Sequence, residues 1–260
     1  MLRVPGWLKV AAKQALPVRL QTSLRAYYLK SSVLVSDQEE PEMRIIHSLV
    51  RPGEVVLDIG ANIGRYTTLL SELAGEKGHV FAFEPIADNF KILSSVIRDG
   101  HFKNVTPLQV ALDREVGHRD MVIPENSDFT GFYQAHLAGQ GDRGKREEVK
   151  VVSLDNLRRN NVFDRIHFIK CDAEGSELGI LEGASITLRE DRPAIFLEIQ
   201  RKTSNEVFNL LLDLQYRAFI LDGELMEVAE YQNSFWNYFF LPPSYLSRID
   251  AQQSLIRQPC

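Results

Sequence analysis

An acid and two glycines close an apolar run in the stretch VVLDIGANIGRYTTLL, where they are Asp58, Gly60 and Gly64. At the carboxyl end of a first parallel strand, glycines let a ligand approach the backbone, and the following helix offers it free N–H groups. The fingerprint G-x-G-x-x-G is absent because Asn62 and Arg65 occupy its second and third positions, and no G-K-[ST] ending follows. The turn therefore favours a nucleoside ligand that has no phosphate to cradle.

Glu84 supplies a second indication of such a ligand. It ends the next β-rich run, where Rossmann-type sheets place the acid that accepts hydrogen bonds from ribose hydroxyls. Its carboxylate would repel the 2′-phosphate of NADP, and Asp58 adds negative charge that suits a cationic ligand. S-adenosylmethionine carries a sulfonium, an ammonium and a ribose diol but no phosphate, so it fits the turn better than NAD. An NAD-linked oxidoreductase or epimerase remains an alternative.

A second group of acids stands in DAEGSE, residues 172–177, after an apolar run that we expect to be the fourth strand. Asp172 and Glu174 can both face the crevice where open α/β sheets bind ligands. A carboxylate there would take the proton of an attacking hydroxyl and accelerate transfer by about 10²–10⁴-fold. The competing interpretation is structural: Asp172 orders the turn, and Glu174 or Ser176 caps the next helix. We expect Glu177 to be a first-turn acid that complements the helix dipole.

Two further features limit the reactions that we expect in this crevice. Glu198 stands near the end of the next apolar run, where an unpaired carboxylate is costly, so we place it beside the same cleft. With Asp172 and Glu174 it offers oxygen ligands for magnesium, but we favour a metal-free acid/base role. The tetrad N/D-P-P-Y/F of many amino-methylating enzymes is absent after the fourth strand, which favours oxygen as the methyl acceptor.

A long insertion, residues 113–153, contains the histidine that we consider the rival base, His136. It follows a stretch that mixes aromatic and hydrogen-bonding side chains, and we interpret this stretch as a lid over cofactor and acceptor. Aromatic faces there suit a sugar or a flat polyketide-like ring, although they would equally pin the loop to the core. The proposed lid and acceptor contacts are Phe129, Thr130, Phe132 and Tyr133, with Glu198 at the border.

The elements that must position these residues alternate between β-rich and amphipathic stretches, which predicts a parallel sheet with crossover helices. The last two β-rich runs, Tyr216–Leu221 and Phe235–Leu241, predict an antiparallel pair and bring the total to seven strands. The other expected strands are Val55–Ile59, His79–Phe83, Val105–Ala111, Ile166–Cys171 and Ala194–Ile199, and the expected helices are Ile63–Leu73, Ala87–Arg98, Glu177–Leu188 and Ser204–Leu214.

Composition and charge set the remaining limits. The 260 residues are 44% hydrophobic and 25% charged, typical of a soluble globular protein, and no run approaches the ~20 apolar residues of a membrane span. The start lacks a signal-peptide pattern, and two cysteines cannot build a disulfide framework, so we expect a cytoplasmic protein. The acidic body, with no basic stripe, argues against nucleic acid as a partner.

Residues 1–36 form a separate basic module with six bases and no acid, within a chain whose net charge is −5. Apolar residues recur between the bases at helical spacing, so a helix at an anionic membrane surface is one interpretation. The alternative, which we favour, is helices that pack over the core or on a second copy in a homo-oligomer, because Pro5 and Pro17 interrupt the pattern.

The segments VLDIGANIGRYT, VFAFEPIADNF, FIKCDAEGSELGILEGA and PAIFLEIQ resemble, in order and spacing, the FkbM family of S-adenosylmethionine-dependent methyltransferases. The resemblance covers about residues 53–241. It implies the class I methyltransferase fold: α/β, Rossmann-like, with seven mostly parallel strands, an antiparallel last strand and helices on both faces. It also implies methyl transfer to a hydroxyl oxygen of a small molecule, which in this family is a sugar, a glycolipid or a polyketide-type product.

The resemblance implies a role for individual positions as well. Glu84 would take the ribose hydroxyls, Pro85 and Ile86 would flank the adenine, and Ala111 to Asp113 would lie near the base. The methionine end would contact Asp58, Gly60, Ala61, Asn62 and Gly64, with Asp172 serving both cofactor and catalysis. The methyltransferase domain would span residues 37–241, followed by a tail, 242–260. A non-catalytic cofactor-binding or membrane-peripheral module is the remaining alternative.

Overall fold

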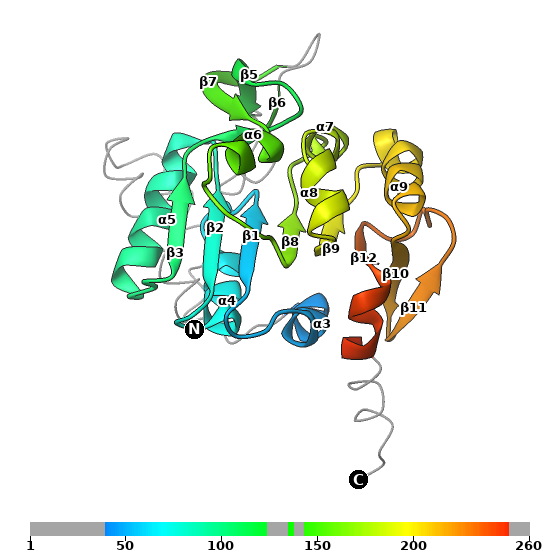
Figure 1. The fold of residues 1–260 in the computed structure, drawn as a ribbon. Helices are drawn as coiled ribbons and strands as arrows, with labels where there is room; N and C mark the ends of the chain where they lie inside the picture. The colour runs from blue at the N-terminus through cyan, green and yellow to red at the C-terminus, as the bar shows by residue number, and fades with distance from the viewer. Residues whose placement is uncertain (1–39, 124–134, 138–142, 250–260) are drawn as a thin grey trace, which may run out of the picture.

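The computed structural model describes residues 40–123, 135–137 and 143–249. Its main feature in these ranges is an eight-stranded sheet in which only β12 and β11 run against the other strands (Figure 1). The strands, in spatial order, are β11 (Glu224–Val228), β10 (Arg217–Asp222), β12 (Asn237–Leu241), β9 (Ala194–Glu198), β8 (Phe168–Cys171), β1 (Val55–Ile59), β2 (His79–Phe83) and β3 (Val105–Leu108). The predicted α/β class, with an antiparallel last strand, is confirmed.

Helices cover both faces of this sheet, as expected. Successive side chains of a strand point to opposite faces, and the strands are apolar in both directions, so each face builds its own core. One core packs under α3 (Pro41–Leu49), α4 (Arg65–Ala74) and α5 (Ala87–Asp99). The other packs under α6 (Leu154–Arg159), α7 (Glu177–Glu182), α8 (Ser185–Glu190) and α9 (Ser204–Asp213). Short 3-10 turns are η2 (Arg201–Thr203) and η3 (Pro243–Tyr245).

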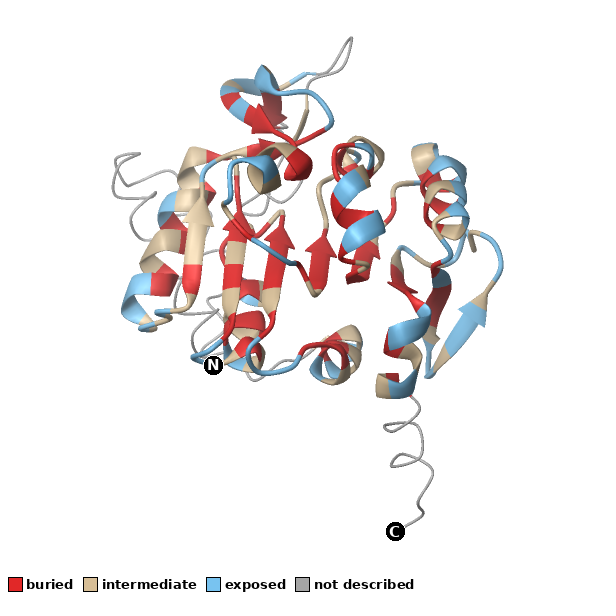
Figure 2. Cartoon of the chain, in the orientation of Figure 1, coloured by how far each residue is buried: buried red, intermediate tan, exposed pale blue. Residues whose placement is uncertain are grey.

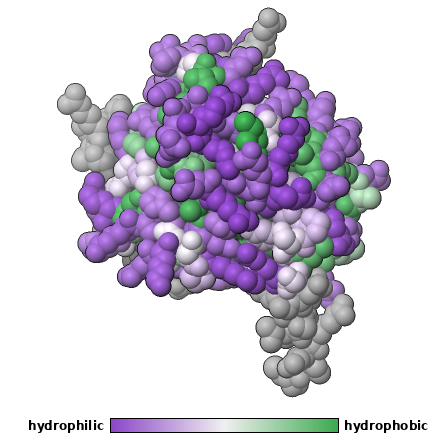
Figure 3. Space-filling view, in the orientation of Figure 1, coloured by the Kyte–Doolittle hydropathy of each residue, from purple (hydrophilic) through white to green (hydrophobic). Residues whose placement is uncertain are grey.

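Burial follows the same plan. Figure 2 shows buried residues concentrated in the central strands and on the inner sides of the helices, while the outer sides of the helices are exposed. The viewed surface is mainly hydrophilic, with apolar residues in small separate groups (Figure 3). None of the helices within the described ranges has the length and apolar character needed to cross a bilayer.

The insertion is folded where it is described. It forms a second sheet, which lies over the end of the main sheet where β1 and β2 finish (Figure 1). Its strands, in order, are β4 (Ala111–Leu112), β7 (Lys145–Val152), β5 (Gly117–Ile123) and β6 (His136–Leu137). Its apolar residues pack on Ile86, at the start of α5, and Ala87 N donates to Glu147 Oε1 at 2.8 Å. The second sheet is therefore docked on the main sheet.

Several expected elements differ from the structure in their extent. The sheet has one strand more than the seven predicted, because the chain after Gly223 returns as β11 along the outer edge of β10. The single helix expected at Glu177–Leu188 is divided at Gly183, where a Cβ would lie 2.6 Å from Asp113 O. Edge strand β3 ends before Ala111, contains Pro107, and passes the chain to β4 of the second sheet.

Some predictions fall outside the described residues. They are the basic helical extension, residues 1–36, most of the tail beyond residue 249, and the four lid contacts Phe129, Thr130, Phe132 and Tyr133.

Candidate active site

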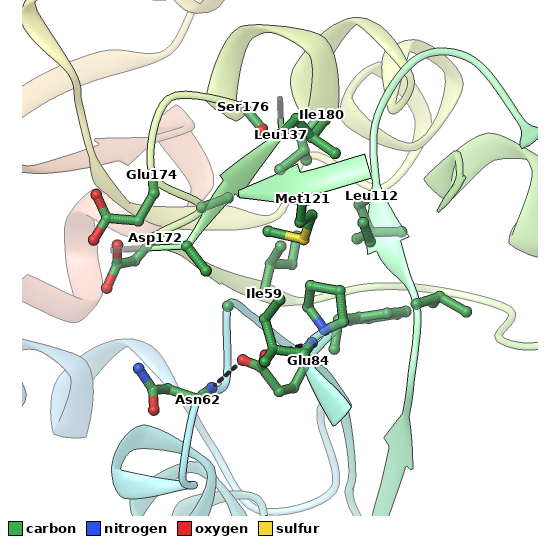
Figure 4. A pocket seen from close by; sticks show the side chains of 18 residues that line it. Ile59, Asn62, Glu84, Leu112, Met121, Leu137, Asp172, Glu174, Ser176 and Ile180 are labelled. Carbon is green, nitrogen blue, oxygen red and sulfur yellow. Dashed lines mark hydrogen bonds between the residues drawn. The ribbon is translucent and has the colours of Figure 1, made fainter. Parts of the chain in front are cut away.

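A pocket of about 150 Å³ opens at the carboxyl ends of β1, β2 and β8, beneath the second sheet. The residues that line it come from the ends of β1 and β2, from the loops after β1, β2 and β8, from α7, and from β4, β5 and β6 of the second sheet with the residues beside them (Figure 4). They are Ile59, Gly60, Asn62, Phe83, Glu84, Pro85, Ile86, Val110, Ala111, Leu112, Met121, Ala135, Leu137, Asp172, Ala173, Glu174, Ser176 and Ile180. Acidic and apolar side chains occupy different ends of this pocket.

Gly60 sets the floor of the pocket. It has φ +71, and a Cβ on it would lie 1.8 Å from Asp172 O, so the loops after β1 and β8 are in backbone contact. Only glycine allows both this conformation and this approach. The next turn brings in Asn62, also at positive φ, whose side-chain Oδ1 is buried in the pocket wall without a hydrogen-bond partner among the described residues.

Glu84 lies in the middle of the pocket, where the sequence placed it. Its Oε2 accepts from Asn62 N at 2.9 Å and its Oε1 accepts from Ile86 N at 2.8 Å (Figure 4). The side chain is buried, and desolvation raises the pKa of Glu84 to about 7, although the two backbone N–H groups favour the carboxylate. Glu84 therefore ties the loops after β1 and β2 together and presents a carboxyl group to a ligand.

The apolar end of the pocket is built jointly by the two sheets. Pro85 and Ile86 follow Glu84, and Met121 and Leu137 reach in from β5 and β6 (Figure 4). Leu112 and Ile180 complete it. A flat, weakly polar ring suits this end, as predicted for the adenine.

The acidic end is formed by Asp172 and Glu174, whose carboxyl groups lie together in Figure 4. Glu198, at the end of β9, is half-buried and acts on the same group electrostatically. Burial is the main cause that raises the pKa of Glu174 to about 7, and the nearby charges of Asp172 and Glu198 are the next largest causes. Burial likewise raises the pKa of Glu198. The three acids predicted for this cleft are thus brought together, although Glu198 does not line the pocket itself.

The loop that carries these acids is held by Glu177, whose role the sequence only partly indicated. Glu177 lies in the first turn of α7, as expected of an acid that complements the helix dipole. Its side chain also folds back toward the loop, where its Oε1 accepts from Gly175 N at 2.9 Å and from Ala173 N at 3.2 Å. Glu174 has φ +49, a conformation that is costly for a side-chain-bearing residue and that is concentrated at functional sites. Its carboxyl group also accepts from Gln200 Nε2 at 3.3 Å.

Lys170 is the residue that sequence reasoning missed. It lies on β8 with 4% of its surface exposed, and its Nζ is 3.6 Å from both Asp58 Oδ1 and Asp172 Oδ2. A lysine inside the otherwise apolar run FIKC was the available signal, since a buried cation needs an anionic partner. Asp58 and Lys170 are paired in register across β1 and β8, which makes that contact obligatory.

Besides Glu198, the structure leaves five of the predicted site residues that it describes outside the pocket lining. Asp58 is fully buried beneath the loop, where it accepts from Thr67 Oγ1 at 2.6 Å. Asp113 instead forms an ion pair with Arg119 and accepts from Arg114 N. The other two loop residues, Ala61 and Gly64, are buried, with Gly64 as the N-cap of α4, and the fifth residue is His136.

His136 is not brought to the carboxyl groups. Its neighbours Ala135 and Leu137 line the pocket, and successive side chains in a strand point to opposite faces, so His136 points away from it. Geometry therefore leaves Asp172 and Glu174 as the titratable pair at the acidic end.

Comparison with known families identifies this arrangement. The model of the methyltransferase FkbM domain matches residues 58–218, which is more than half of the chain and includes both acidic loops. The chain belongs to the FkbM methyltransferase family. The matched segment runs from Asp58 at the end of β1 to Ala218 in β10, so it contains every residue that lines the pocket.

Curated relatives of this FkbM-family chain are methyltransferases. The hexuronic acid methyltransferase AglP of Haloferax volcanii is 27% identical over 155 residues, covering 58% of each protein. The 31-O-demethyl-FK506 methyltransferase FkbM of Streptomyces tacrolimicus is 31% identical over 160 residues, covering 52% of this chain and 60% of that protein. The chain thus spans about three fifths of the length of the curated relatives it matches.

Solved structures of methyltransferases are similar as well. A methyltransferase FkbM from Methylobacillus flagellatus matches with a TM-score of 0.47 at 18% identity, covering 89% of this chain and 57% of that one. An O-methyltransferase from Bacillus cereus also gives 0.47, at 14% identity, covering 90% and 96%. The strand order of the main sheet itself gives the fold of this FkbM-family chain.

Proposed function

We propose that the protein is an S-adenosylmethionine-dependent O-methyltransferase that acts on a hydroxyl group of a small molecule. The observation that carries this proposal is the division of one pocket into an acidic end and an apolar end, with Glu84 between them. Membership of the FkbM methyltransferase family supports methyl transfer as the reaction. The names of the two curated relatives, which mention a hexuronic acid and FK506, support a sugar, a glycolipid or a polyketide-type product as acceptor.

The pocket fits S-adenosylmethionine in three respects. The Oδ1 of Asn62, buried without a partner among the described residues, can accept a hydrogen bond from the ammonium of the ligand. Glu84 can accept from the ribose hydroxyls, and the apolar end can enclose the adenine. When bound, the cofactor supplies a methyl group that its positive sulfur has already activated, so the protein needs mainly to orient the acceptor and to remove a proton.

Glu174 is the carboxyl group that we assign to proton removal. Its raised pKa, about 7, places it near the pH at which a general base is most effective. Asp172 lies beside it and keeps negative charge at the cationic end of the ligand. Transfer to a hydroxyl would then require that the acceptor oxygen lies in line with the S–CH3 bond of the cofactor and within hydrogen-bond reach of Glu174.

Calorimetric titration of the purified protein with S-adenosylhomocysteine tests the cofactor assignment. We expect micromolar affinity, about −8 kcal/mol, and at least tenfold weaker binding for Glu84→Gln, which loses one acceptor oxygen. The matched control is Glu206→Gln, an exposed acid on α9, which should bind like the wild type. Equal affinity for NAD, or no binding of S-adenosylhomocysteine, would overturn the proposal.

A further inference from the structure

The ammonium group of Lys170 lies between the loops after β1 and β8, which both contribute to the pocket. Besides Asp58 and Asp172, it donates to Gly60 O at 3.1 Å and approaches Ile59 O at 3.5 Å. Asp58 and Ile59 end β1, Gly60 begins the loop after it, and Asp172 begins the loop after β8. One buried cation therefore binds the anionic and carbonyl oxygens of both loops at once.

A ring closes the remaining side of this cation. Lys170 Nζ lies 5.2 Å from the centroid of Tyr66, near the start of α4, and Tyr66 in turn packs on Phe196 of β9 with ring centroids 5.8 Å apart. Tyr66 OH donates to Glu40 Oε2 at 2.5 Å. The ammonium is thus enclosed by oxygens and by an aromatic face, an environment that keeps it charged and fixed.

The two acids at the pocket differ in their access to this charge. Asp172 Oδ2 is within salt-bridge distance of Lys170, whereas Glu174 has no salt-bridge partner in the described part of the chain and accepts only a neutral amide hydrogen bond from Gln200. A carboxylate paired with a buried ammonium stays ionised and immobile. A carboxyl group without such a partner is free to gain and lose a proton.

We propose that Lys170 is a positioning residue, which clamps the loops after β1 and β8 together and reserves Asp172 as a fixed anion, so that Glu174 is the group that takes the acceptor proton. This proposal rests on the proposed function, and it deepens it by naming Lys170 as the residue that sets the different roles of the two acids. The electrostatics agree with the geometry: after burial, the charge of Asp172 contributes most to raising the pKa of Glu174, while the charge of Lys170 lowers it.

The test compares Asp58→Asn with the double variant Asp58→Asn/Lys170→Met. Removing both members of the buried pair avoids leaving an unpaired buried charge, which is the main cause of unfolding in such variants. Relative to Asp58→Asn, we expect the double variant to bind S-adenosylhomocysteine about tenfold more weakly, because the loops lose their clamp. Lys77→Met, an exposed lysine between α4 and β2, is the matched control and should bind normally.

Carbon-13 NMR titration of the Glu174 carboxyl group, assigned with Glu174→Gln, gives a readout that a packing role would not move. Loss of the ammonium should shift its midpoint upward by roughly 0.5–1 pH unit. Unchanged affinity together with an unchanged midpoint would overturn the proposal. Because the titration needs no ligand, it separates failure of this proposal from failure of the cofactor assignment.

A measurement on the wild type covers the case in which the double variant does not fold. Nitrogen-15 NMR of the lysine side chains should find the Nζ of Lys170 protonated at pH 8, with slowly exchanging hydrogens, as a buried ammonium bonded to carbonyl oxygens requires. A neutral amine at that pH would mean that no fixed cation lies between the two loops, and this result would overturn the proposal.

Discussion

At the scale of single residues, the site depends on acids that burial makes unusual. Glu84 and Glu174 both have pKa values raised to about 7, with desolvation as the largest cause in each case. A raised pKa means that the protonated form persists to higher pH than in a free side chain. Ligand binding and proton removal, which both need the ionised form, should therefore improve as the pH rises through neutrality.

Glu174→Gln should keep affinity for S-adenosylhomocysteine within about threefold while methyl transfer falls by about 10²–10⁴-fold, because only the proton acceptor is lost. In the wild type, kcat/KM should rise with pH through about 7 as Glu174 ionises, and level off above. The measurement is a pH profile of methyl transfer to a hydroxylated acceptor. A variant with full activity, or a profile that is flat across neutrality, would contradict the assignment of Glu174 as base.

Glu84 should make cofactor affinity depend on pH. With a pKa of about 7, about one tenth of the protein carries the ionised Glu84 at pH 6 and about nine tenths at pH 8. If ribose hydroxyls bind the carboxylate, the apparent affinity for S-adenosylhomocysteine should be about tenfold higher at pH 8 than at pH 6. Calorimetry at the two pH values measures this ratio, and Glu84→Gln should abolish the difference.

Residues with local signals could be predicted from sequence, and residues defined by long-range contacts could not. Glu84 and Gly60 were found because strand ends and glycine turns are visible along the chain. Met121 joins the pocket only because a second sheet folds over the first. The ion pair of Asp58 with Lys170 joins residues 112 positions apart, and only the register of β1 with β8 brings them together.

At the scale of elements, the loops after β1 and β8 act as one structure. Their backbones meet at Gly60 and Asp172, and Glu177 holds the second loop from the first turn of α7. Such close approach leaves no room for a side chain. The loop after β1 should therefore be sensitive to a single added methyl group.

Gly60→Ala should destabilise the protein far more than Gly53→Ala does. Both glycines have positive φ, +71 and +91, so both variants carry a conformational cost of about 1–2 kcal/mol. A Cβ at Gly53 meets nothing within 4 Å, whereas at Gly60 it meets Asp172 O. We expect Gly60→Ala to cost about 2 kcal/mol more in the free energy of unfolding, measured by urea denaturation. Equal costs would show that the two loops are not in rigid contact.

Element boundaries could be predicted where the hydrophobic periodicity is unbroken. The predictions failed where short segments pair with partners that are remote in the sequence. The bounds of β1 and β2 agree with the sequence prediction. The two-residue strands β4 and β6 were missed, because so short a segment carries no periodicity and is defined only by its partner. Strand β11 was missed because none of its five residues is buried, so it carries no apolar alternation and is defined by its pairing with β10.

At the scale of the whole molecule, one pocket joins two sheets. The main sheet supplies Glu84 and the acidic loops, and the second sheet supplies Met121 and Leu137. A ligand that contacts both sheets stabilises their docking as well as each sheet, since it binds only when the two are together. Ligand binding should therefore stabilise parts of both sheets that lie beyond the residues lining the pocket.

Hydrogen exchange should reveal this coupling. Saturating S-adenosylhomocysteine should slow amide exchange in the loop after β1 and in β5 and β7, because opening of the second sheet then requires release of the ligand. The hairpin of β10 and β11, at the far edge of the main sheet, serves as the internal control and should exchange at the same rate with and without ligand. Protection confined to the main sheet would contradict a shared pocket.

The two edges of the main sheet affect how the protein behaves when it is concentrated. Open edges are templates for strand addition between molecules. On β3, Leu108 O accepts from Glu84 N, so Pro107, one position earlier, turns its nitrogen outward, and that nitrogen has no hydrogen to donate. On β11, the outer edge carries the exposed acids Glu224 and Glu227. One edge lacks a donor, and the other carries charged side chains that include the ion pair of Glu227 with Arg217 of β10, so neither edge is a favourable template for a further strand.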